Sequence, residues 1–170
     1  MNQATSELED SRILKIAEWV QPQIVLLDAD ARDRTQAFEI AAAAMGRLLA
    51  CDPVPMLRAL WRREQVGSTA LGNGIAIPHA RIHNIQQPLT VFLRLKTPLL
   101  FDAPDGKPVS ELLVIMVPPD EAGRDHLLLL AVVARLFSKH RFRALLDAAQ
   151  DVPAVGHAFR EGIASVVSVG

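Results

Sequence analysis

The run from Leu112 to Val117 constrains the fold of this chain more than any other segment. Every residue in it is large and apolar, so a strand built from it has no face that suits water. Such strands are typical of the centre of a sheet whose two faces are both covered. Leu89 to Leu95 predicts a second strand, and Ile24 to Leu27 a shorter one. Between the two longer strands, Ala103 to Gly106 predicts a turn.

Helical patterns alternate with these strands. The clearest covers residues 34–50, where Asp33 and Gln36 resemble a capping box in front of an apolar stripe. A second helix is expected to begin at Asp52 and to end before Gly67. Further helices are predicted at residues 13–20, 124–138, 141–149 and 153–166. Strands and helices in this order predict an α/β sandwich with a mixed, mostly parallel sheet flanked by helices.

The length of 170 residues suits one domain, so residues 1–170 are expected to form a single domain, with residues 1–10 frayed. Half of the residues are hydrophobic and the formal net charge is -1, which indicates a globular protein and disfavours nucleic acid as a partner. Cys51 is the only cysteine, so neither an internal disulfide nor a cysteine zinc cluster is available. No signal peptide is recognisable, and the longest apolar runs are shorter than the ~20 residues that cross a bilayer. We therefore expect a soluble cytoplasmic protein without membrane insertion.

The segment from Gly67 to Arg81 carries the chemistry. Pro78 restricts its own backbone and pushes the preceding residue toward an extended conformation, so His79 follows a stiff segment. Gly72 and Gly74 allow positive φ and close backbone approach, as in an anion-binding nest. The segment therefore predicts a phosphate site around His79.

Further side chains support phosphate chemistry at His79. Ser68 and Thr69 bring hydroxyl donors, and Arg63 on the incoming helix brings a planar guanidinium that matches phosphate geometry. A neutral imidazole is nucleophilic near physiological pH and can take up a phosphoryl group. His126 stands at the start of a helix after the central strand, where it could face His79 at one edge of the sheet.

Other interpretations of the histidines are available. His79 and His83 have the spacing of a metal pair on a helix, which would suit a metal-dependent hydrolase. The segment lacks the glutamate of an HExxH motif and follows a proline, so we expect no metal and no cofactor. A histidine behind a proline can also be a simple surface residue, and a Gly-Asn-Gly segment is a common turn.

The stretches Arg63–Thr69 and Leu71–His79 resemble the active-site signature of the fructose/mannitol-type (type 2) enzyme IIA of the bacterial phosphotransferase system, in particular its nitrogen-regulatory branch. The resemblance covers about residues 24–150, and the segment after Gln150 follows the family pattern less closely. It implies a mixed sheet of about five strands between helical layers. It also implies that His79 is phosphorylated by an HPr-like phosphocarrier, with Arg63 and His126 next to the phosphoryl group.

The resemblance leads to one expected function and two alternatives. We expect a histidine phosphocarrier that regulates target proteins through its phosphorylation state. One alternative is a sugar-specific IIA component that passes phosphate to a IIB protein or permease. The other, from a different class, is an interaction module without phosphotransfer, which the joint presence of Arg63, His79 and His126 disfavours.

Overall fold

The computed structural model describes residues 3–119 and 124–167. The chain forms two compact units. One comprises residues 22–119, and the other combines residues 1–21 with residues 120–170. The first unit contains the whole sheet and the predicted phosphate segment, whereas the described part of the second is helical.

The sheet lies in the unit of residues 22–119. Its strands, hydrogen-bonded in the order β1-β5-β6-β3-β2 with β4 also on β6, are β1 (Ile24–Ala29), β2 (Ala70–Gly72), β3 (Ile75–Ala76), β4 (His79–Arg81), β5 (Leu89–Leu99) and β6 (Val109–Val117). β1 pairs with β5, and β3 and β4 with β6, in parallel; β5–β6 and β2–β3 are antiparallel. The predicted mixed α/β class is confirmed, and the apolar run 112–117 lies in the central strand, β6.

The sheet has six strands, but two of them, β3 and β4, lie one after the other along the same side of β6. Ile75 of β3 lies opposite Glu111 of β6, and His79 of β4 lies opposite Ile115, so the register does not change between β3 and β4. Pro78 separates the two because it has no N–H to donate, while its carbonyl accepts the Ile115 N–H at 2.9 Å. The sheet is therefore close to the expected five strands, with one neighbour of β6 interrupted at the proline.

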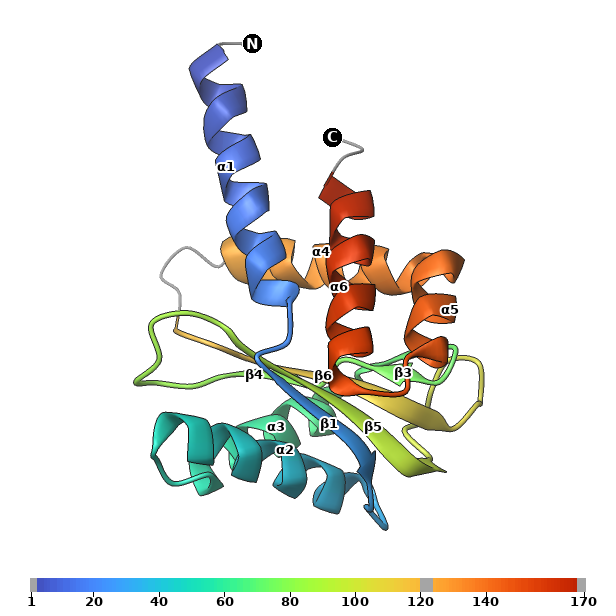
Figure 1. Ribbon diagram of the computed structural model, residues 1–170. Helices are drawn as coiled ribbons and strands as arrows, with labels where there is room; N and C mark the ends of the chain where they lie inside the picture. Colours follow the sequence, from blue (N-terminus) through green and yellow to red (C-terminus); the bar gives the residue numbers. More distant parts are fainter. Residues whose placement is uncertain (1–2, 120–123, 168–170) are drawn as a thin grey trace. The chain divides into compact units, whose positions relative to one another are not determined.

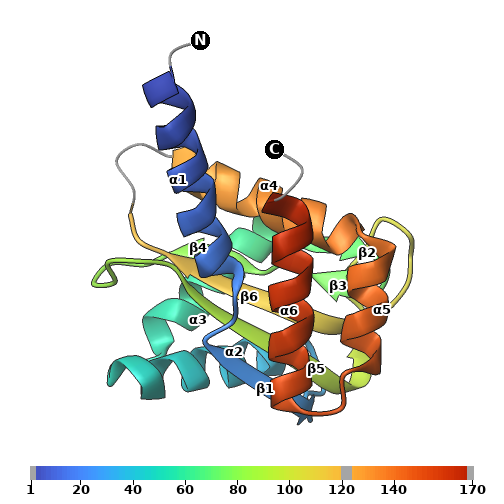
Figure 2. The ribbon, with the colours of Figure 1, turned by 45° about the horizontal axis from the view of Figure 1, so that its top comes forward.

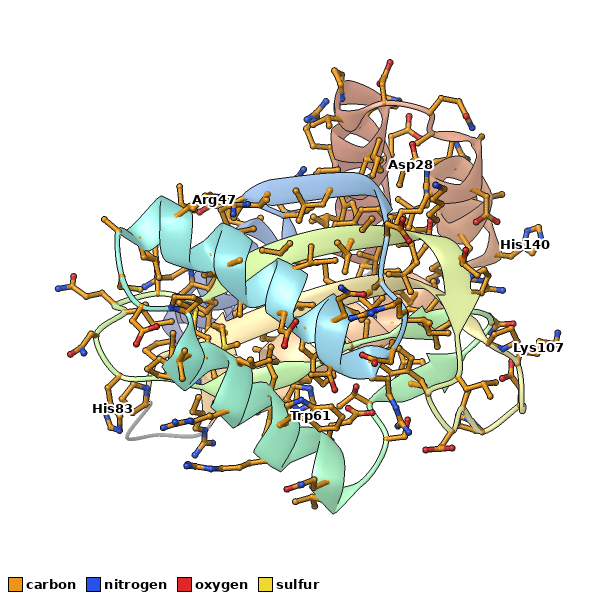
Figure 3. The ribbon with its side chains drawn as sticks, turned by 90° about the horizontal axis from the view of Figure 1, so that it is seen from below. Asp28, Arg47, Trp61, His83, Lys107 and His140 are labelled. Carbon is orange, nitrogen blue, oxygen red and sulfur yellow. The ribbon has the colours of Figure 1, made fainter. Side chains whose placement is uncertain are left out.

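Two helices cover one face of this sheet, α2 (Arg34–Leu49) and α3 (Val54–Val66), as Figure 1 and the view from below in Figure 3 show. Phe38 of α2 and Met116 of β6 are fully buried in the same hydrophobic cluster. Phe38 also meets Trp61 of α3 edge to face, with ring centroids 5.5 Å apart. The apolar stripes of the two helices thus form the core with the strands.

The helix starts follow the sequence signals with small corrections. Asp33 caps α2 as predicted, because its Oδ1 accepts the Gln36 N–H at 2.9 Å. In a capping box the side chain at the third helical position accepts the N–H of the cap residue. Here Gln36 Oε1 instead accepts the N–H of Arg32, the residue before the cap, at 2.8 Å. The cap position of α3 is Pro53 instead of Asp52, although Asp52 Oδ1 still accepts the Val54 N–H at 3.0 Å.

The second unit contains α1 (Gln3–Val20), α4 (Arg124–Ser138), α5 (His140–Ala148) and α6 (Val152–Val167). Figure 2 shows α6 beside α4 and α5, and the rings of Phe137, Phe142 and Phe159 meet edge to face between these helices. Arg12 of α1 pairs with Asp125 of α4. Aromatic packing and an ion pair thus connect the four helices.

The first helix is longer than the one predicted at residues 13–20. Helix α1 begins at Gln3 and so includes residues 3–10, for which fraying stays a prediction. This stretch contains neither glycine nor proline, so nothing in it stops the helix that Ile13–Val20 predicts. Within residues 3–119 and 124–167, no helix is both long and apolar enough to span a bilayer.

Candidate active site

His79 is the first residue of β4, and hydrogen bonds occupy both of its ring nitrogens. Nδ1 lies 2.7 Å from the carbonyl oxygen of Ile77, and Nε2 lies 3.2 Å from Nε of Arg63. A carbonyl only accepts, so Nδ1 carries the proton, and Nε2 presents its lone pair to the arginine. The half-buried imidazole is therefore held as the neutral tautomer with Nε2 as the nucleophilic atom.

Arg63 lies in the last turn of α3, where the sequence predicted it. Its Nη1 donates to the carbonyl oxygen of Gly67 at 2.9 Å, just past the helix end, while its Nε donates to His79. Two bonds from one planar group fix its orientation beside the imidazole. The structure thus brings together two of the predicted residues, the imidazole of His79 and the permanent positive charge of Arg63.

Glu64, which the sequence analysis did not single out, organises the adjoining loop. Its side chain is only 2% exposed. Its carboxylate accepts the Thr69 hydroxyl at 2.7 Å and the Thr69 N–H at 3.3 Å. Arg34 of α2 lies 3.8 Å away and also pairs with Asp102 at 2.9 Å. A buried carboxylate with three donors around it holds the loop that follows Arg63.

A signal for Glu64 was present in the sequence. It follows Met56 and Leu60 at intervals of four, and all three are the buried residues of α3. A charged residue on the apolar face of a helix indicates a buried polar contact, because an unpaired buried charge is too costly.

The hydroxyls of Ser68 and Thr69 are bonded within the protein. Ser68 Oγ donates to the carbonyl of Phe101 and accepts the Ala70 N–H at 3.1 Å, while Thr69 donates to Glu64. These bonds shape the loop between α3 and β2. Contact of either hydroxyl with phosphate stays a prediction.

Gly72 and Gly74 flank the tip of the β2–β3 hairpin, with φ of 93° and 77°. Asp105 reaches this tip from the loop before β6, and its Oδ2 accepts the Asn73 N–H at 2.8 Å. That bond, followed by the one from the Lys107 N–H, lowers the pKa of Asp105 below the ordinary 3.8. The positive φ angles that the sequence predicted are present, while phosphate binding by these glycines stays a prediction.

Other predicted residues lie elsewhere. His126 is half-buried in α4, in the other compact unit, so its position next to the phosphoryl group stays a prediction. His83 is exposed after β4, and β4 is a strand, so His79 and His83 do not form a helical metal pair. Among the residues that the structure describes, no three His, Cys, Asp or Glu side chains are grouped to hold a metal ion.

Comparison with known proteins places the chain in a family. Residues 18–161 match the model of the phosphoenolpyruvate-dependent sugar phosphotransferase system, EIIA 2, a longer stretch than the expected 24–150. A nitrogen regulatory protein of Bradyrhizobium diazoefficiens is 32% identical over 84% of this chain and 92% of its own length. One from Escherichia coli is 36% identical over 70% and 73%. The crystal structure of nitrogen regulatory protein IIA-Ntr from Neisseria meningitidis, 32% identical, has a TM-score of 0.75 and covers 85% of this chain and 99% of that one.

Proposed function

The chain belongs to the EIIA type 2 family of the phosphoenolpyruvate-dependent sugar phosphotransferase system, and we propose that it carries a phosphoryl group on Nε2 of His79. The donor is an HPr-like phosphocarrier protein. The single observation that carries the assignment is the pair of bonds on the His79 ring, which leaves Nε2 with its lone pair beside Arg63.

The transfer follows from this geometry. The Nε2 lone pair forms the new N–P bond as the N–P bond of the donor's phosphohistidine breaks and its electron pair returns to the donor ring. Such transfers depend on in-line positioning and on compensation of charge on the phosphoryl oxygens. Arg63 can move its donors from Nε2 to those oxygens, and Nδ1–H stays bonded to the Ile77 carbonyl, which helps the ring to carry positive charge.

Regulation is the proposed use of the phosphate. The relatives reported above are named nitrogen regulatory proteins, and we propose the same kind of role for this chain in a cytoplasmic relay. A phosphoryl group adds negative charge, which creates or removes binding to target proteins. The proposal needs no cofactor.

The test is phosphorylation in vitro with phosphoenolpyruvate, enzyme I and the HPr-like carrier. Wild-type protein should take up an acid-labile label, and phosphorus NMR should report phosphorylation at Nε2. His79→Ala should abolish the label, while His83→Ala, an exposed histidine four residues away, should keep it. A label that persists in His79→Ala, or a signal from Nδ1, would reject the assigned atom.

The supporting residues are tested in the same assay. Arg63→Ala should slow transfer by about a hundredfold, as the loss of a charge-compensating donor does in other enzymes. Arg63→Lys should recover only part of the rate, because it loses the planar fork. For His126→Ala we expect slower transfer with labelling still complete, and unchanged kinetics would reject its role.

The alternative within the family, a sugar-specific transport component, is tested by measuring which protein receives the phosphate. A regulatory carrier should not pass its phosphate to a sugar-linked IIB protein at a useful rate. Rapid transfer to such a protein would identify the chain as a transport component instead.

A further inference from the structure

A basic cleft of about 730 Å³ lies next to the strand that carries His79. Arg58 and Arg62 of α3 and Arg81 at the end of β4 supply its positive charge, and His83 also lines it. Arg58 and Arg62 are one helical turn apart and exposed, and Arg81 and His83 are exposed across the cleft. In Figure 3, His83 projects at the edge of the molecule, near the Val54 end of α3.

Ion pairs within the protein do not account for these side chains. Among the residues that the structure describes, no carboxylate pairs with any of the four. The single acidic residue of the lining, Asp52, already accepts the N–H of Val54. The cleft therefore carries a local positive potential available to a partner.

The rest of the lining is apolar. Met56 is buried, and Ile82 and Ile85 are half-buried against the core of the same unit. Apolar side chains surrounded by arginine are typical of protein–protein interfaces, in which Met and Arg are enriched. A site for a small phosphorylated ligand would instead present converging backbone N–H groups or a well-enclosed cavity. The lining favours a polypeptide.

We propose that the basic cleft binds an acidic, amphipathic segment of a partner protein. Apolar side chains of the segment contact the half-buried Ile82 and Ile85, while its carboxylates pair with the surrounding arginines. Two carboxylates one helical turn apart match Arg58 and Arg62. Opposite charges across such a surface select the partner and speed its encounter.

The cleft lies close enough to His79 for phosphorylation to affect binding of the acidic segment. His79 and Arg81 are alternate residues of β4, so their side chains leave the same face about 7 Å apart along the strand. The points at which the two side chains attach are therefore closer together than the Debye length of about 8 Å at physiological salt. Resting on the proposed function, phosphorylation of His79 brings negative charge close to the bound carboxylates. The acidic segment therefore binds the unphosphorylated protein more tightly.

The probe is a fluorescein-labelled synthetic peptide that forms an amphipathic helix, with leucines on one face and glutamates beside them. A peptide with lysine at every glutamate position is the control. Fluorescence anisotropy measures affinity, and amide chemical shifts of the full-length protein locate the bound peptide. We expect shifts at Arg58, Arg62 and Ile82 with the acidic peptide only, and loss of binding in ~1 M salt, where charges are screened.

The matched variants are Arg58→Glu with Arg62→Glu, and Arg47→Glu with Arg135→Glu, which change the net charge equally at exposed sites elsewhere. The first pair should weaken binding about tenfold or more, as reversal of interfacial charges does, and the second should leave it unchanged. Equal binding of the lysine peptide, or equal effects of both pairs, would overturn the proposal. Shifts in the cleft with inorganic tripolyphosphate but not with the acidic peptide would also overturn it.

Phosphorylation separates the two proposals. Phosphorylated protein should bind the acidic peptide several-fold more weakly than the unphosphorylated form, and His79→Ala should bind it like the latter. If phosphorylation leaves the affinity for the peptide unchanged, the proposed coupling between the cleft and His79 is overturned. If His79 takes up no phosphate while the peptide still binds, the proposed function fails and the cleft assignment stands.

Discussion

Glu64 is a buried carboxylate directly beside Arg63, and it is the residue on which the loop after α3 most depends. Replacing it with glutamine keeps its shape but removes the charge that Thr69 and Arg34 face. Hydrogen bonds to charged groups contribute about 1.5–3 kcal/mol, so Glu64→Gln should lower the free energy of unfolding by about that amount. Urea unfolding measures it, with the exposed Glu39→Gln as a control that should change little.

The same variant should also slow phosphoryl transfer, because Arg63 is held by the carbonyl of Gly67 in that loop. Glu64→Asp should keep the negative charge on a side chain that is one methylene shorter. It should therefore recover part of the unfolding free energy and part of the transfer rate. A normal unfolding free energy in Glu64→Gln would show that the carboxylate is dispensable.

Asp105 connects its own loop to the β2–β3 hairpin, and its contribution depends on pH. Its folded-state pKa lies below 3.8, because the ionised carboxylate accepts N–H groups of Asn73 and Lys107. Its stabilising effect is therefore complete above the unfolded-state pKa and is lost as the pH falls through the lower folded-state value. Asp105→Asn should be less stable than wild type at neutral pH, and this difference should shrink as the pH is lowered below 3.8. A difference independent of pH would contradict this account.

Single residues in the site were predictable to different degrees. Arg63 and His79 stood out because their chemistry is specific, and the structure joins them through one hydrogen bond. Glu64 did not, because a glutamate in the last turns of a helix usually lies in water. Its role requires Thr69 and Arg34, and which residues a folded chain brings to a carboxylate is not local information.

At the scale of elements, α6 depends on one glycine for its close approach to its neighbours. A Cβ on Gly162 would lie 2.5 Å from the ring of Phe142 and 2.6 Å from Leu136. Gly162→Ala should therefore lower the unfolding free energy by about 1–3 kcal/mol through overpacking, despite the better helix propensity of alanine.

Gly156, in the same helix, provides the matched control. A Cβ there would meet only the ends of flexible side chains, Arg160 Nη1 at 3.3 Å and Gln21 Nε2 at 3.8 Å. Gly156→Ala should stabilise the protein by about 0.5–1 kcal/mol. Thermal denaturation of the two variants gives the comparison, and equal shifts in the same direction would rule out the packing explanation.

The long elements were predictable, and the short ones were not. The apolar pattern placed α4 at residues 124–138, as found, because the pattern of an amphipathic helix is local. β3 and β4 have two and three residues, too few for any periodicity. β4 pairs with β6, far along the chain, and β3 pairs with both β6 and the neighbouring β2, so hydrogen bonds to other strands define them. The sequence therefore indicated the site but not the strand that holds it.

At the scale of the whole molecule, the two units offer a test of the single-domain prediction. The chain contains two tryptophans, Trp19 in one unit and Trp61 in the other. Trp61→Phe leaves a reporter for the unit of α1, and Trp19→Phe leaves one for the unit of the sheet. If residues 1–170 form one domain, fluorescence and far-UV circular dichroism should give the same midpoint within each variant. Different midpoints for the two signals of one variant would reject a single cooperative domain.

The unchanged register of β3 and β4 along β6 has a consequence for signalling. The backbone of His79 is paired with the central strand, β6, so the proposed gain or loss of a phosphoryl group cannot shift it without breaking that ladder. The side chain of Arg63, by contrast, reorients without disturbing any strand. The unit of residues 22–119 should therefore keep almost the same backbone in both states while its electrostatic surface differs. A partner that distinguishes them recognises charge, not shape.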